Sequence, residues 1–508
     1  MMSYNQNKTL EDLKLLQETI NHIKLQISIL KDIQIRNLQE DNNNNNTGIE
    51  EGNNNDYYYS SGDTAWMIFA TILVIFMTLP GIMIYYAGMV RLQNALSTAM
   101  QGFGLVCVIT FLWLCFGYSL SFGPSHSKDV NAVIFGDSSR FWLHGIYHSN
   151  TYHDLAPTIP ESVFCCFQLA FAIITPTLIC GAFADRMKYL SVLISLGLWH
   201  LVVYCPIAHS NWHPDGFLHK AGVLDFAGGN VVHISAGVSA LVSAIIVGKR
   251  TGYETTQYLP HNLLLSLVGS CFLMAGWIGF NSGSYYAADI IAGFSILNTF
   301  IAGSFSSMTW LLIDIFTTGK PKIYGVMNGY LAGCVGITPA AGYVDPCASF
   351  VIGVICGCLC RYGCKLKVLF SFDDSLDAFG IHCVSGIIGG IMVGLFANDS
   401  IHGHYGLIYG KPTQILIQLY GITITILWSS IGTALIFLLV DKVIGLRVTK
   451  RSEVSGLDQS EHGTTLAAQI LHIAPLKRAP IEKKKLEWFI SVIGIKLSKT
   501  IEKNTSEL

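Results

Sequence analysis

Long apolar runs separated by short polar segments dominate the chain from residue 64 to residue 441. A helix of about 20 residues crosses a hydrocarbon core of about 30 Å, and eleven of the runs are of about that length. They lie at 64–88, 97–122, 162–183, 188–208, 226–248, 262–281, 286–316, 322–340, 343–363, 378–397 and 414–441. The pattern therefore predicts an all-α integral membrane protein with eleven transmembrane helices.

Basic residues are distributed unevenly between alternating loops. One set of loops holds Arg91, Arg186, Lys188, Lys249, Arg250, Lys320, Lys322, Arg361, Lys365, Lys367, Lys442, Arg447, Lys450 and Arg451, whereas the other holds Lys128, Arg140, Lys220 and Lys411. Short basic loops stay in the cytosol. We therefore expect a membrane domain at 63–445, a cytosolic C-terminal tail at 446–508 and, with an odd number of spans, an extracellular or lumenal N-terminal tail at 1–62.

Both tails carry patterns of their own. Residues 13–30 show a short heptad seam rich in isoleucine, which is typical of a coiled coil or of a short surface helix. An asparagine tract, Asn42 to Asn46, follows as a spacer. At the other end, a basic and amphipathic segment at 483–497 is typical of a helix on the inner leaflet.

Composition supports a membrane protein and narrows its chemistry. The chain is 51% hydrophobic and 13% charged, whereas a soluble protein is about 25% charged. A net charge of −2 gives no indication of nucleic-acid binding. The fourteen cysteines lie outside the two tails, mostly in apolar segments, and no HExxH or CxxC pattern occurs, so we expect neither a metal site nor a cofactor nor an enzyme.

Two histidines stand deep within predicted spans. His233 lies in the fifth span and His382 in the tenth, and each follows an aspartate, Asp225 or Asp377, near the start of its helix. A separation of five spans predicts an inverted repeat of five plus five helices followed by a final long helix. Each aspartate is also the residue type that caps a helix N-terminus, and a buried histidine can be an ordinary core residue, although two at matching places favour a site.

Five stretches resemble the ammonium transporter family, which includes the methylammonium permeases and is related to the Rhesus proteins. They are YYAGMVRLQNALS (85–97), DFAGGNVVHISAG (225–237), GWIGFNSGS (276–284), DAFGIHCVSGIIGG (377–390) and GLDQSEHG (456–463). The resemblance covers about residues 60 to 465. It implies an eleven-helix bundle with five-plus-five pseudo-symmetry, a pore in each subunit and a homotrimer in the plasma membrane or in an endosomal or vacuolar membrane.

The resemblance also implies roles for single residues. His233 and His382 resemble the twin pore histidines, and the pair Phe171 and Phe280 resembles the stacked phenyl gate. An outer recruitment site is implied at Trp212 and Ser284, with Asp225 behind it. Read without the resemblance, the two phenylalanines are core packing and the tryptophan is an interfacial aromatic residue.

Together these features predict transport of ammonium, ammonia and methylammonium, with an ammonium sensor that signals through its tails as the alternative. Burial disfavours the charged form of an amine, so the cation is expected to lose a proton and to continue as ammonia past the two histidines. Ser460, within GLDQSEHG, is a candidate regulatory position at which phosphate would add charge beside Asp458 and Glu461. An unmodified surface serine is the alternative.

Overall fold

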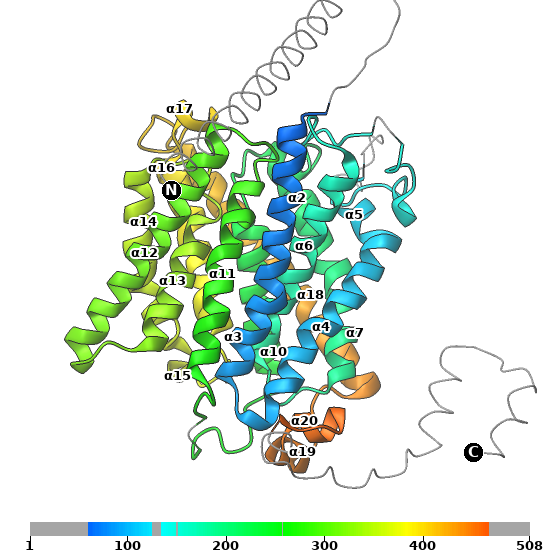
Figure 1. Cartoon of the computed structure of the whole chain (residues 1–508), viewed down its shortest axis with the longest axis vertical. Coiled ribbons are helices and arrows are strands. Elements are labelled where there is room, and N and C mark those ends of the chain that lie inside the picture. Colours follow the sequence, from blue (N-terminus) through cyan, green and yellow to red (C-terminus); the bar gives the residue numbers. More distant parts are fainter. Residues whose placement is uncertain (1–58, 124–133, 149–150, 257, 467–508) are drawn as a thin grey trace, which may run out of the picture. The chain divides into compact units, whose positions relative to one another are not determined.

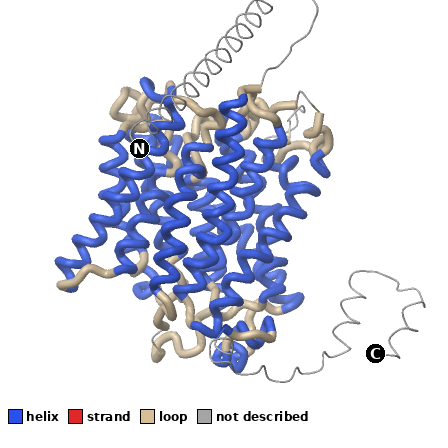
Figure 2. Tube along the Cα trace, in the orientation of Figure 1, coloured by secondary structure: helices blue, strands red, loops and turns tan. Residues whose placement is uncertain are grey.

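The computed structural model describes residues 59–123, 134–148, 151–256 and 258–466, and these form helices joined by loops (Figure 1). Within those ranges the only strand-like pairings are two isolated bridges, between His153 and Ala156 and between Met187 and Arg447. The heptad seam at 13–30, the asparagine tract and the basic segment at 483–497 lie outside the described residues. The helices run between two layers of loops (Figure 2).

The first half of the membrane domain contains five helical segments. In chain order they are α2 (Ser61–Phe76) with η1 (Met77–Ile82) and α3 (Met83–Met89); η2 (Leu92–Asn94), α4 (Ala95–Leu112), η3 (Trp113–Gly117) and α5 (Tyr118–Phe122); α6 (Glu161–Ile179) with η6 (Cys180–Ala182); α7 (Tyr189–Trp199), η7 (His200–Tyr204), α8 (Cys205–Trp212) and α9 (Phe217–Lys220); and η8 (Gly229–Ile234) with α10 (Ser235–Val247). The single turn η5 (Phe141–Leu143) lies in the loop before α6.

The second half continues with α11 (Leu263–Gly283), α12 (Ile290–Thr318), α13 (Ile323–Ile337), α14 (Pro346–Gly363) with α15 (Leu366–Leu369), η9 (Phe379–Cys383) with α16 (Val384–Phe396), and α18 (Thr413–Ile444). Short helices follow α16 and α18, namely α17 (Asp399–His402), α19 (Lys450–Ser455) and α20 (Leu457–His462). We call the side that carries α17 the vestibule side and the side that carries α19 and α20 the tail side (Figure 1).

Within the described residues, ten helical segments are long and apolar enough to cross a membrane. They match ten of the expected spans, and the protein is an all-α integral membrane protein. The eighth expected span, 322–340, corresponds to α13, an apolar helix of 15 residues. The count of eleven therefore stays a prediction.

The two halves meet at their fifth segments, as the five-plus-five arrangement expects. A β-carbon on Gly237 of α10 would lie 2.3 Å from the backbone nitrogen of Cys383 in η9, and one on Gly386 of α16 would lie 2.9 Å from Ile234 in η8. Each glycine stands four residues after a histidine, so the contact is reciprocal. Only glycine lets the two backbones approach this closely.

The first segments of the two halves also pack together. A β-carbon on Gly269 of α11 would lie 2.4 Å from the backbone nitrogen of Tyr85 in α3, and one on Gly276 would lie 2.4 Å from Met77 in η1. Close packing at glycine also occurs in α13, where a β-carbon on Gly333 would lie 2.3 Å from the carbonyl oxygen of Ala302 in α12.

The start of the C-terminal tail is bound to the tail side. The carboxylate of Asp458 accepts hydrogen bonds from the backbone nitrogens of Leu96 (3.3 Å) and Ser97 (2.7 Å) at the start of α4. The carboxylate of Glu453 accepts a bond of 2.6 Å from the backbone nitrogen of Thr251 in the loop after α10. These two carboxylates join α19 and α20 to the membrane domain.

Candidate functional site

The two predicted histidines face each other at the contact between the halves. His233 lies in η8 and His382 in η9, both of which are π-helical turns, a conformation that occurs often at functional sites. Their Nδ1 atoms are 3.3 Å apart and their rings lie 16° from parallel. If both rings are neutral, one Nδ1 donates and the other accepts.

An aromatic stack covers the histidine pair on its vestibule side. The rings of Phe171 (α6) and Phe280 (α11) are stacked with centroids 4.2 Å apart, and both are fully buried. The ring of Phe280 lies 5.8 Å from that of His233. The ring of Trp277, a residue that the sequence patterns did not single out, is stacked on the ring of His233 with centroids 5.6 Å apart. Access to the histidines from the vestibule side therefore requires displacement of phenyl rings.

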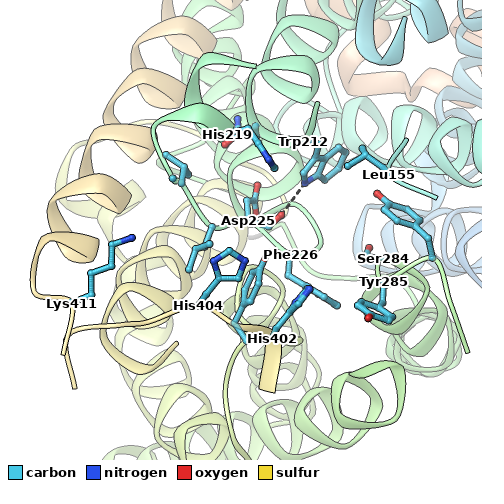
Figure 3. Close-up of a pocket in the computed structure, with 16 residues that line it drawn as sticks. Leu155, Trp212, His219, Asp225, Phe226, Ser284, Tyr285, His402, His404 and Lys411 are labelled. Atoms are coloured by element: carbon cyan, nitrogen blue, oxygen red, sulfur yellow. Dashed lines mark hydrogen bonds between the residues drawn. The ribbon is translucent and has the colours of Figure 1, made fainter. Parts of the chain in front are cut away.

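A cavity of about 340 Å³ opens beyond the stack on the vestibule side (Figure 3). Trp212, Ser284 and Asp225 all line it, as the resemblance implies. The indole ring of Trp212 meets the ring of Phe171 edge to face at 5.9 Å, and its Nε1 donates a bond of 2.9 Å to the backbone oxygen of Asp225. The hydroxyl of Ser284 donates to the backbone oxygen of Phe280 at 2.8 Å.

On the tail side of the histidines, a void of about 20 Å³ is lined by His382, Trp277, Tyr85, Tyr86 and Leu376, among others. A space of this size holds one water-sized molecule. Leu376 also lines a second cavity of about 340 Å³ on the tail side. The order along the molecule is thus vestibule, phenyl stack, histidine pair, small void and tail-side cavity.

Asp225 caps the helix that carries His233. Its carboxylate accepts hydrogen bonds from four consecutive backbone nitrogens, those of Gly228 (3.2 Å), Gly229 (2.5 Å), Asn230 (2.9 Å) and Val231 (3.2 Å). The first turn of a helix leaves such nitrogens without partners. Capping was one of the two roles expected for Asp225, and this carboxylate is fully occupied by it.

The cap expected at Asp377 was wrong: the residue that caps the helix of His382 is Asp374. The carboxylate of Asp374 accepts from the backbone nitrogens of Ala378 (3.2 Å) and Phe379 (2.8 Å). Asp377 has a positive φ of 59° and pairs instead with Lys367 at 2.7 Å, while its other oxygen accepts from Tyr324. The signal for Asp374 was its distance from His382, eight residues, which equals the distance from Asp225 to His233.

Charged side chains surround the tail-side cavity, and the sequence analysis did not place them. Arg250 lines it and forms ion pairs with Asp373 (2.7 Å) and Asp185 (2.9 Å). Burial opposes the charge on Arg250, but the two carboxylates outweigh burial and raise the pKa of the guanidinium. In the described part of the chain, no group of three or more histidine, cysteine, aspartate or glutamate side chains is placed to hold a metal ion.

Two cavities lie on opposite sides of a helical membrane domain, with buried aromatic rings and paired histidines between them, and this arrangement defines a membrane protein with a buried polar site at its centre. The family model of the Ammonium Transporter Family matches residues 65–466, and the chain belongs to this family. The curated relatives are named as ammonium transporters, which are not enzymes.

The ammonium transporter of Bacillus subtilis is 42% identical over 406 residues, which cover 79% of this chain and 97% of that protein. Ammonium transporter 1 of Dictyostelium discoideum is 39% identical over 408 residues, which cover 79% and 86%. The crystal structure of Saccharomyces cerevisiae Mep2 aligns with a TM-score of 0.71 at 33% identity, covering 77% of this chain and 88% of that one. A structure described as a sensor Amt protein aligns with a TM-score of 0.72 at 28% identity, covering 79% and 98%.

Proposed function

We propose that this member of the family conducts ammonium and methylammonium across its membrane by taking up the cation in the vestibule and passing neutral amine along the central path. The observation that carries the proposal is the order of groups along that path: an open cavity, two stacked phenyl rings, and two facing histidines with a void for one small molecule beyond them. Nothing in this order suits a hydrated ion.

Recruitment begins at Trp212. Its indole face binds a cation at about 0.5–2 kcal/mol, and the hydroxyl oxygen of Ser284, in the same cavity, has lone pairs that accept an N–H bond. The carboxylate of Asp225 shapes the cavity wall through its four backbone bonds. It does not serve as a free counter-charge.

The phenyl stack then separates ammonium from metal cations. A cation between Phe171 and Phe280 loses its hydration shell in surroundings that disfavour charge. Ammonium responds by giving up a proton and passing as ammonia, whereas potassium has no proton to give. The stack thus selects by acid–base chemistry, because size alone does not separate these two ions.

The histidine pair guides the neutral molecule. With one Nδ1 donating to the other, His233 has its Nε2 left without a protein partner in a buried position. A buried polar atom without a partner is costly, and ammonia, which both donates and accepts, supplies the missing bond. The pair therefore provides a polar hydrogen-bonding position between the phenyl stack and the small void.

We place the vestibule side outside the cytosol, because the loops there carry few basic residues. The C-terminal tail is then cytosolic and the N-terminal tail is extracellular or lumenal, in the plasma membrane or an endosomal or vacuolar membrane. We further propose a homotrimer with one path in each subunit. No nucleic acid or cofactor takes part.

Ser460 in α20 is the proposed regulatory position of the tail. It is exposed and its hydroxyl donates to the backbone oxygen of Gly456 at 2.9 Å. A phosphate here adds negative charge close to Asp458 and Glu461, and repulsion weakens the attachment of α20. Ser460→Asp should change uptake, whereas Ser455→Asp, at an exposed position in α19, serves as the matched control. Equal uptake in both variants and in the wild type contradicts this role.

Uptake of labelled methylammonium by cells without ammonium transport of their own tests the proposed function. The wild type should restore uptake. His233→Ala and His382→Ala should each change the rate of methylammonium uptake by about tenfold or more when the amounts of protein in the membrane are equal. His200→Ala is the matched control, because His200 is also fully buried on a π-helical turn, η7, but does not line the path. Wild-type uptake in both pore variants would refute the assignment of the path.

The second candidate function is ammonium sensing, which the alignment with a sensor Amt protein favours. Purified protein in liposomes separates the two functions. A transporter releases methylammonium into the lumen, and a pure sensor binds it without flux.

A further inference from the structure

The vestibule is lined by basic side chains, although it is the proposed entrance for a cation. His219, His402, His404 and Lys411 all line the cavity (Figure 3), and the single carboxylate among the lining residues is that of Asp225. That carboxylate is already occupied by four backbone nitrogens. A cavity that attracts cations ordinarily carries free acidic groups, so the presence of three histidines needs a reason.

Two of the histidines are fixed within an aromatic wall. The ring of His402 is stacked on that of Tyr343 at 5.0 Å and meets the edges of Tyr285 (5.4 Å) and Phe226 (6.2 Å). His404 lies 5.7 Å from His402, measured between ring centroids. Gly403, with φ of 67°, provides the left-handed turn between them.

The charged and titratable groups around this pair come from five parts of the chain. Asp289 and Tyr285, which precede α12, lie near His402; the carboxylate of Asp289 accepts from the backbone nitrogens of Ile291 and Ala292. His219 in α9 and Lys411 before α18 lie near His404. Tyr343, after α13, contacts both rings, and Asp225, before η8, lines the same cavity.

These surroundings keep the pair neutral near pH 7. Burial lowers the pKa of His402, His404 lowers it further, and Asp289 opposes the shift. Burial also lowers the pKa of His404, with Lys411 and His219 acting in the same direction. The neutral rings present an aromatic surface with ring nitrogens, and acidification adds positive charge to the same surface.

We propose that His402 and His404 make ammonium binding in the vestibule sensitive to protons, because a proton bound to either ring places a positive charge in the cavity that the cation must enter. The inference rests on the proposed function. Binding of protons and of ammonium is then mutually unfavourable, and by linkage each lowers the affinity for the other. Acidification raises KM, and saturating substrate overcomes this effect.

The test measures the KM for methylammonium at external pH from about 5 to about 8, with the internal pH fixed. Methylammonium is an alkylamine like the side chain of lysine, with its pKa of about 10.4, and stays protonated throughout this range. For the wild type we expect KM to rise on the order of threefold to tenfold towards the acidic end, as expected for one or two charges near the substrate. In the double variant His402→Gln and His404→Gln, which retains His219 in the cavity, the rise of KM should be clearly smaller than in the wild type.

Two further variants keep the test decisive. His404→Arg makes the charge permanent, so KM should be raised at every pH, with a weaker dependence on pH. His148→Gln is the control, because His148 is an exposed histidine in the loop before α6 and does not line the cavity. It should retain the wild-type rise.

Each outcome has a definite meaning. A level KM in the wild type, or a wild-type rise in the double variant, overturns the inference while leaving the transport function standing. Absence of any uptake by the assembled wild-type protein overturns the proposed function itself. A double variant that assembles poorly is replaced by His404→Gln alone, for which the rise should be smaller than in the wild type; an undiminished rise counts against the proposal.

Discussion

Replacement of Asp225 by alanine should destabilise the protein before it alters the chemistry of the path. The carboxylate accepts two short bonds, from Gly229 (2.5 Å) and Asn230 (2.9 Å), and two longer ones of 3.2 Å. A hydrogen bond to a charged group contributes about 1.5–3 kcal/mol. Loss of the two short bonds alone should therefore lower the free energy of unfolding by about 3 kcal/mol. That is a large part of a typical total stability of about 5–15 kcal/mol.

Heating the detergent-solubilised protein and following its elution by size measures this loss. Asp225→Ala should lower the midpoint of thermal unfolding on the order of 5 °C or more and reduce the amount that reaches the membrane. Asp225→Asn retains one amide oxygen as acceptor and should fall between alanine and wild type. The control is Asp215→Ala: Asp215 lies on the same side but pairs with the exposed Lys220 at 3.1 Å, an interaction of about 0–1 kcal/mol. Wild-type unfolding and membrane amounts in Asp225→Ala would refute the capping argument.

Three further predictions concern the gate, the second cap and the contact between the halves. Phe280→Ala removes half of the phenyl stack and should admit other monovalent cations, detected as potassium currents; currents like those of the wild type contradict the gate. Asp374→Ala removes the cap of the helix of His382, so it should lower the free energy of unfolding by about 1–2 kcal/mol and also lower uptake. Asp377→Ala is the control, because it should leave that cap in place. The prediction fails if thermal unfolding and uptake in Asp374→Ala match the wild type. Gly237→Ala places a β-carbon 2.3 Å from the facing backbone and should lower the free energy of unfolding by about 1–3 kcal/mol or more. Gly293→Ala is the control and should leave stability unchanged, because nothing lies within 4 Å of that position. Equal unfolding midpoints in the two variants would contradict the packing argument.

Apolar runs and histidine spacing were enough to predict most of the fold. A bilayer fixes the length of a spanning helix, so run length predicts spans with few alternatives. The exception is α13: its expected span, 322–340, includes residues beyond Ile337 that continue in turns, not in helix. Thr338, Pro339 and Ala340 carry no charge, so the uncharged run continues past Ile337 and does not mark the end of the helix.

The site was predicted in part. The spacing of His233 and His382 led to their pairing, since an inverted repeat brings equivalent residues together. The two vestibule histidines, His402 and His404, were not predicted to line a cavity. They lie in a short loop, where neither the spacing of apolar residues nor hydropathy indicates one. Their proximity to Trp212 depends on how loops from distant segments close over the same helix ends.

The misplaced cap explains how the two halves are built around the path. In the segment DDSLD (373–377), any of three aspartates can cap the following helix by residue type, and only the backbone decides. The positive φ of Asp377 turns its side chain towards Lys367, which leaves Asp374 to bind the helix nitrogens. Both caps then stand eight residues before a histidine, one on the vestibule side and one on the tail side. Each carboxylate accepts hydrogen bonds at the positive end of its own helix, so neither offers a free counter-charge to a cation at the histidines. This arrangement supports the proposed passage of the neutral amine.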